Sequence, residues 1–153
     1  MTTLILAVAL LLPPFPGVPT LSVSVPAPIV QTETHGGTRL PATGWATYYG
    51  DGIFEQVLAN QLRYDNIQPD TCPACVGNAA MLWPEDLDRI VCLLTEDGRE
   101  YGPLWVVDSA ASQHRQALID SGWVVDLEKR VHQDVLGLPN APTLVTVTGC
   151  TTP

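Results

Sequence analysis

The chain has 153 residues, 46% of them hydrophobic, which is enough for one domain of ordinary size with its own core and leaves little room for a second. Seven Lys and Arg against 16 Asp and Glu give a net charge of −9, and no basic patch occurs, which argues against a nucleic-acid or anionic-lipid partner. The 14 prolines and 12 glycines predict many turns and short strands rather than long helices.

The start of the chain predicts export. Residues 4–12 (LILAVALLL) form an apolar run that ends at Pro13. The run is too short for a transmembrane helix, which needs about 20 residues, but it is typical of the central region of a secretory signal. We therefore expect residues 1–27 to be a signal segment with cleavage after Ala27, although no Lys or Arg precedes the run and a buried strand is the alternative. The mature protein is then secreted or in the cell envelope, with no stable membrane span.

A tether is predicted between this signal and the folded domain. Residues 28–43 belong to a stretch rich in Pro, Thr, Ser and Val that contains few charges. This composition is typical of an extended, semi-rigid linker without a core of its own. The folded domain is accordingly expected over residues 44–150.

Four cysteines lie in the predicted domain: Cys72, Cys75, Cys92 and Cys150. An even number of cysteines in a small exported domain favours two structural disulfides. The spacing leaves two alternatives, structural zinc and a redox Cys-x-x-Cys pair, but a second Cys-x-x-Cys and a surrounding βαβ pattern are both absent. Sequence does not choose the pairing, and our hypothesis is Cys75 with Cys92 and Cys72 with Cys150. We expect no metal and no cofactor.

Hydrophobic patterning predicts mainly β-structure after the tether. Alternating or β-branched runs bounded by Gly, Pro or acidic turn residues indicate strands at 44–50, 90–95, 101–108, 123–127 and 143–148. Residues 109–121 and 128–136 have near-helical spacing and end at Gly122 and Gly137, which predicts two short helices.

Four segments resemble the RlpA-like and expansin families of double-psi β-barrel proteins. Residues 44–50 (GWATYYG) are similar to the opening strand of these proteins, and residues 79–84 (AAMLWP), 106–108 (VVD) and 124–127 (VVDL) match three later motifs in the same order. The resemblance covers nearly the whole predicted domain. It implies a six-stranded double-psi β-barrel with two short helices.

The resemblance also implies a secreted, monomeric domain that acts on polysaccharide of the cell wall. RlpA-like proteins cleave peptidoglycan glycan strands as lytic transglycosylases, whereas expansins bind and loosen wall glycans without hydrolysis. By position, Asp108 corresponds to the acidic catalytic residue and Asp126 to the aspartate of the later motif. Thr47 and Tyr49 correspond to residues that line the groove in expansins.

The chemistry of glycosidic cleavage gives the two aspartates a possible role. One carboxyl must stay protonated near neutral pH to protonate the leaving oxygen, and an apolar strand such as residues 104–107 before Asp108 would raise a carboxyl pKa. The alternative is that Asp108 and Asp126 cap the helices predicted after them. A groove that holds both aspartates within about 10 Å, flanked by Thr47 and Tyr49, would favour an enzyme.

Two departures from the family pattern argue against strong catalysis. The family histidine falls at Met81, which cannot transfer a proton, and the tyrosine that expansins place two positions after their aspartate falls at Ala110. Exposed aromatic rings offer a different route to glycan binding, because the CH faces of sugars stack on aromatic planes, and Trp45 and Tyr49 share one face of the first strand. We therefore expect a glycan-binding module without strong catalysis, with a lytic transglycosylase that uses Asp108 as general acid as the alternative.

Overall fold

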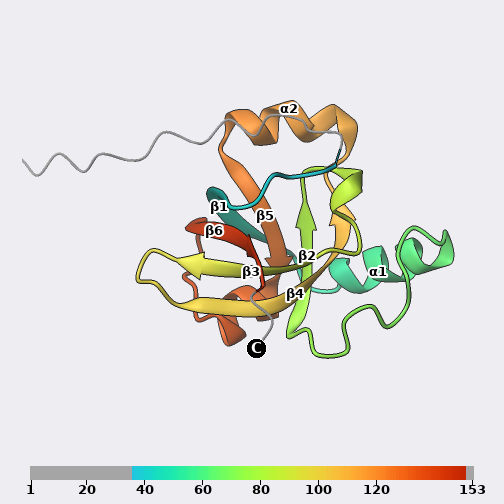
Figure 1. The fold of residues 1–153 in the computed structure, drawn as a ribbon, viewed down its shortest axis with the longest axis horizontal. Coiled ribbons are helices and arrows are strands. Elements are labelled where there is room, and N and C mark those ends of the chain that lie inside the picture. The colour runs from blue at the N-terminus through green and yellow to red at the C-terminus, as the bar shows by residue number, and fades with distance from the viewer. Residues whose placement is uncertain (1–35, 151–153) are drawn as a thin grey trace, which may run out of the picture.

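The computed structural model of the chain describes residues 36–150 (Figure 1). The predicted signal segment and residues 28–35 of the predicted tether lie outside the described residues. Within the described part, no helix has the length and apolar character needed to cross a membrane.

Six strands form one closed barrel of mixed orientation. Around the barrel they follow the order β1-β5-β2-β4-β3-β6, in which β1 pairs with β5 and β2 with β4 in parallel while the other neighbours are antiparallel. The predicted class, a mainly β chain with a closed six-stranded barrel, is confirmed, and the topology is compatible with a double-psi barrel. The strands are β1 (Ala42–Tyr49), β2 (Gly77–Met81), β3 (Ile90–Thr95), β4 (Glu100–Ser109), β5 (Trp123–Glu128) and β6 (Thr143–Gly149).

β2 is a strand that the alternation of hydrophobic and polar residues did not predict. Its sequence, GNAAM, contains Gly, Asn and Ala, which have low β-propensity. Tertiary pairing overrides this propensity, because β2 lies between β4 and β5 and is hydrogen-bonded to both. The other five strands lie within two residues of their predicted bounds.

Helices cover the outside of the barrel and differ more from expectation. Helix α1 (Ile53–Arg63) was not predicted, although Phe54, Leu58 and Leu62 recur at helical spacing and pack towards the barrel. Helix α2 (Ser112–Asp120) is shorter than predicted, because β4 continues to Ser109. In the second predicted helix, Val131–Val135 forms a single wide helical turn, and a 3-10 turn spans Pro84–Asp86. Figure 1 shows α1 and α2 on different sides of the barrel.

Three hydrophobic clusters hold the domain together. The largest fills the barrel interior with side chains from all six strands, mostly Val, Leu and Ala. A second cluster lies outside, between α1 and the barrel, and contains Phe54, Ile67, Ala80, Trp105 and Val107. The third cluster lies under α2 and contains Leu82, Trp83 and Trp123.

All four cysteines form disulfides, but the predicted pairing is wrong. Cys72 bonds to Cys75, and Cys92 bonds to Cys150. The Cys75 amide donates to the Cys72 carbonyl at 3.1 Å, and this tight turn brings the two sulfurs together. Cys92 pairs with Thr148 in the β3–β6 ladder, so the chain delivers Cys150 beside it. With every thiol oxidised, the zinc alternative loses its thiolate ligands.

A buried aspartate fixes the chain that precedes β1. Asp86 is fully buried, and its carboxylate accepts hydrogen bonds from the Thr38 amide at 2.7 Å and the Thr38 hydroxyl at 2.6 Å. Arg89 donates to the same carboxylate at 2.7 Å and compensates its charge. Packing against the barrel therefore begins within the predicted tether.

Candidate functional site

A β-bulge in β4 directs Asp108 to the outer face of the barrel. Ala79 on β2 pairs with Val106, but the next residue, Ala80, pairs with Asp108, so Val107 is an extra residue in β4. In a regular strand Asp108 would share the inward face of Val106, because side chains alternate. The extra residue places Asp108 beside Ala80 instead, outside the barrel core.

A second bulge does the same for Asp126 in β5. Trp45 pairs with Trp123, but Ala46 pairs with Val125, so β5 has one residue more than β1 at this point. Val125 is fully buried in the barrel interior, and Asp126 therefore faces outwards. In both Val-Val-Asp segments the two valines therefore lie at a bulge, and the aspartate that follows them faces outwards.

The two aspartates lie on one row across four neighbouring strands. Thr47 on β1 pairs with Asp126 on β5, and Ala80 on β2 pairs with both Asp126 and Asp108. Neighbouring strands are about 4.8 Å apart, so the backbones of Asp108 and Asp126 are separated by about 10 Å. The site residues suggested by the resemblance, Thr47, Asp108 and Asp126, therefore meet on the same surface.

Hydrogen bonds orient the Asp108 carboxylate. The Tyr49 hydroxyl donates to its Oδ2 at 3.2 Å, and Gln61 Nε2 of α1 donates to its Oδ1 at 3.1 Å. Asn66 Nδ2 in turn donates to Gln61 Oε1 at 2.8 Å. The capping interpretation is wrong for this residue, because α2 follows Ala111 and has no side-chain cap.

Asp126, on β5, is a half-buried carboxylate. The Thr47 hydroxyl donates to Asp126 Oδ1, and Trp123 Nε1 donates to the Thr47 oxygen at 2.9 Å. Burial raises the pKa of Asp126, the negative charge of Asp108 adds to the rise, and the hydrogen bonds from Thr47 and Trp123 oppose it. Asp126 does not cap the following helical turn, since that turn is preceded by Arg130 and has no side-chain cap.

Tyr49 is a hydrogen-bond donor to Asp108, and its ring is not an open stacking platform. Its ring packs against Phe54, with ring centroids 4.7 Å apart. Burial raises its pKa above the usual value for tyrosine, and the charges of Asp108 and Asp126 raise it further. Tyr49 therefore remains neutral, and its hydroxyl donates to Asp108.

An aromatic groove opens beside this row. Trp45 is 39% exposed and lies next to Trp123, its register partner on β5. The groove has a volume of about 400 Å³ and is lined by Trp45, Thr47, Ser121, Trp123 and Pro142. Because Thr47 lines the groove and also donates to Asp126, the Asp126 carboxylate lies directly behind the groove wall. The sequence indicated Trp45 and Thr47 but not Ser121 and Pro142, which reach the groove from the turn before β5 and the approach to β6.

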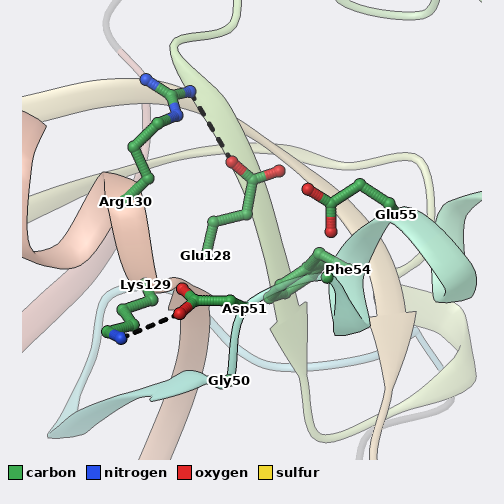
Figure 2. Close-up of a pocket in the computed structure, with 8 residues that line it drawn as sticks. Gly50, Asp51, Phe54, Glu55, Glu128, Lys129 and Arg130 are labelled. Atoms are coloured by element: carbon green, nitrogen blue, oxygen red, sulfur yellow. Dashed lines mark hydrogen bonds and ion pairs between the residues drawn. The ribbon is translucent and has the colours of Figure 1, made fainter.

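A second, smaller pocket lies where β1 and β5 end. It has a volume of about 130 Å³, and its charged lining residues are Asp51, Glu55, Glu128, Lys129 and Arg130. Lys129 pairs with Asp51 at 3.0 Å, and Arg130 lies 3.8 Å from Glu128 (Figure 2). The sequence did not identify this pocket, because its walls come from the turn between β1 and α1, the start of α1, and residues 128–130 at the end of β5.

The family histidine position does not contribute to the site. Met81 is fully buried in the barrel interior, so its side chain lies on the opposite face of β2 from Ala80. Among residues 36–150, no group of three or more His, Cys, Asp or Glu side chains is arranged to hold a metal ion. The sequence matches no protein-family model and no curated protein.

Proposed function

We propose that this chain is an exported, RlpA-like double-psi barrel that binds polysaccharide of a cell wall or extracellular matrix, without strong catalysis. The observation that carries the proposal is the groove in which the half-exposed Trp45 lies beside Trp123. A tryptophan ring offers a flat apolar surface for the CH face of a sugar, and the Thr47 hydroxyl in the same groove offers a polar partner for sugar hydroxyls.

Two further features support binding over turnover. Met81 replaces the family histidine and is buried, and Ala110 replaces the expansin tyrosine, so neither position can move a proton.

The two disulfides support export, because such bonds persist in oxidising compartments outside the cytosol.

A sedimentation experiment tests the proposal. The purified chain is mixed with insoluble peptidoglycan and with other insoluble wall polysaccharides, and the bound fraction is measured. Trp45→Ala is expected to weaken binding about tenfold, equivalent to about 1.4 kcal/mol. Tyr64→Ala is the matched control, because Tyr64 is 66% exposed at the end of α1. Equal binding by the wild type and Trp45→Ala would refute the groove as the binding surface.

The alternative function is a lytic transglycosylase, and the raised pKa of Asp126 supports it. A general acid must hold its proton near neutral pH, and Asp126 combines burial with a position beside the groove. In this reaction one carboxylic acid protonates the leaving oxygen, and the carboxylate that remains accepts the proton of the sugar's own hydroxyl as that hydroxyl attacks the anomeric carbon. The resemblance assigns the acid to Asp108, but the surroundings of Asp126 suit the role better.

Product analysis separates the two functions. The chain is incubated with peptidoglycan, and soluble anhydro-sugar products are measured for the wild type, Asp108→Asn and Asp126→Asn. Binding without products supports the glycan-binding module. Products that disappear in Asp126→Asn identify the enzyme and its acid.

A further inference from the structure

The two disulfides of this chain lie in different surroundings. Cys92 is 5% exposed within β3, and the half-buried Cys150 directly follows β6, so the barrel wall holds both ends of their bond. Cys72 and Cys75 lie outside the helices and strands, in the connection from α1 to β2, which Figure 1 shows as an outer loop of the molecule. A reagent can therefore reach the Cys72–Cys75 bond without opening the sheet.

The turn that carries Cys72 and Cys75 is accessible from solvent. Both cysteines are half-buried, Pro73 and Ala74 between them are exposed, and Val76 after them is 37% exposed. The cysteines pack against the second hydrophobic cluster, between α1 and the barrel, so the protein covers one side of the bond and leaves the other open. Exposed disulfides exchange with external thiols more readily than buried ones.

Backbone hydrogen bonds hold this turn in shape independently of the sulfur–sulfur bond. The Cys75 amide donates to the Cys72 carbonyl at 3.1 Å and closes the turn. Directly after it, the Val76 amide donates to the Pro103 carbonyl at 2.9 Å, where β2 joins β4. The two cysteines therefore stay close together after reduction, and the bond can form again.

The segment before the turn is fixed in the same way. The Thr71 hydroxyl donates to the Gln68 carbonyl at 2.9 Å, and the Gln68 amide donates to Asp88 Oδ2 at 2.9 Å. Trp105 of β4 donates to Oδ1 of the same carboxylate at 3.1 Å. Contacts that contain no sulfur therefore tie this segment to the barrel.

Reduction of Cys72–Cys75 should leave the barrel folded. The bond joins residues only three apart, so it constrains the unfolded chain little, and neither cysteine belongs to a strand or to the cluster inside the barrel. Cys92–Cys150 joins residues 58 apart and links the end of β6 to β3. Reduction of the shorter loop is thus separable from unfolding, as a reversible redox site requires.

We propose that Cys72–Cys75 is a thiol–disulfide exchange site that accepts two electrons from a dithiol protein of the thioredoxin class. One thiolate of the dithiol attacks a sulfur of the Cys72–Cys75 bond, which breaks and releases the other cysteine as a thiolate that takes up a proton. The second thiolate of the dithiol attacks the mixed disulfide, and the remaining cysteine leaves and is protonated in turn. Two electrons and two protons thus pass to this chain, and the dithiol becomes a disulfide.

In this exchange the chain is the electron acceptor and the dithiol supplies the nucleophile. The site therefore does not need the βαβ surroundings or the lowered thiol pKa that activate the cysteine of a redox enzyme. It goes beyond glycan binding and does not depend on it.

Alkylation mapping tests the site in the full chain. The oxidised protein is incubated with dithiothreitol without denaturant, quenched with iodoacetamide and digested, and the modified cysteines are measured by mass spectrometry. Cys72 and Cys75 are expected to be modified at least about tenfold faster than Cys92 and Cys150, while the circular dichroism spectrum stays that of the oxidised protein. Oxidised glutathione should then restore the bond. Equal rates for the two disulfides, or reduction that occurs only with unfolding, overturns the proposal.

A thioredoxin whose second active-site cysteine is replaced by serine tests the exchange with a protein, because it cannot resolve the mixed disulfide. The wild-type chain is expected to form a covalent adduct with this probe, and peptide mapping should place the adduct at Cys72 or Cys75. Cys72→Ser with Cys75→Ser should abolish the adduct. The matched control, Cys92→Ser with Cys150→Ser, should retain it, and the wild-type map is decisive even where this control does not fold. An adduct at Cys92 or Cys150, or no adduct at all, contradicts the assignment.

Discussion

Asp108 and Asp126 share a single register partner, Ala80, which lies between them on β2. Their backbone separation is therefore set by two interstrand spacings of the barrel and not by flexible loops. Tyr49, whose pKa is raised partly by the charges of both residues, lies close to both. The acidic row is thus built into the sheet, and its geometry should persist when surface loops change.

The small side chain of Ala80 is expected to be required at this position. Ala80 is 1% exposed and packs in the outer cluster beneath Phe54 of α1. In Ala80→Leu the extra carbons overfill this space, which should cost about 1–3 kcal/mol of unfolding free energy in urea titrations. Ala59→Leu, on the exposed face of α1, is the matched control and should change stability by less than about 0.5 kcal/mol. An unchanged stability of Ala80→Leu would mean that α1 does not pack tightly here.

Asp126 should make stability fall as pH rises. Burial raises its folded-state pKa above the ordinary value of 3.8, so above that pH the folded chain holds a proton that the unfolded chain releases. The contribution of Asp126 to the free energy of unfolding is fully present below its unfolded-state pKa. It is lost as pH rises through the raised folded-state pKa. Urea unfolding from about pH 4 to pH 7 should show the wild type losing stability relative to Asp126→Asn. Asp120→Asn, at the exposed end of α2, should not reproduce this trend. A difference that is constant or grows with pH contradicts the prediction.

His132 should make stability fall as pH falls, which is opposite to the effect of Asp126. Its side chain is fully buried beside Tyr48, neither ring nitrogen has a hydrogen-bond partner within the described part of the chain, and burial lowers its pKa below 6.5. The unfolded chain therefore takes up a proton first, and stability is lost as pH falls below about 6.5. In thermal unfolding, His132→Phe should flatten the pH dependence of Tm over this range. His114→Phe on the exposed surface of α2 should leave it unchanged, and a similar flattening in both variants would rule out burial as the cause.

The two disulfides should contribute unequally to stability. Cys92–Cys150 joins residues 58 positions apart, whereas Cys72–Cys75 joins residues only three apart. In the chain-entropy description the longer loop gives about 4 kcal/mol and the shorter about 2. Replacing each pair by alanines and measuring unfolding in urea should show the larger loss for Cys92 and Cys150. An equal or reversed loss would place the effect of these bonds in native contacts and not in the unfolded chain.

Sequence patterning predicted the strands whose residues alternate and missed the elements that depend on neighbours. The strand β6, TLVTVTG, alternates along its own length and is predictable from local sequence. β2, with its two alanines, becomes a strand only because β4 and β5 flank it. Helix α1 was not predicted, although the spacing of Phe54 and Leu58 is helical and is a local property of the sequence.

The features of the candidate site also divide into those that the sequence predicted and those that depend on tertiary contacts. The two Val-Val-Asp segments and the aromatic strand 44–50 identified Asp108, Asp126, Thr47 and Trp45 as candidates. The burial that raises the pKa of Asp126, and the place of Trp123 in the groove beside Trp45, depended on contacts between strands far apart in the chain. The cysteine partners depended on such contacts as well, because the β3–β6 ladder places Cys150 next to Cys92.

By itself, the sequence determined that this is a small, acidic, mainly β domain with a pair of carboxylates after apolar strands, because composition and two-residue periodicity are local properties. Only the tertiary structure decided that both carboxylates face outwards, that a groove adjoins one of them and that a pocket lined by charged residues of both signs lies where the same strand pair ends. The physical reason is that a bulge reverses the face of every residue after it, and a bulge is defined only by the register of the neighbouring strand.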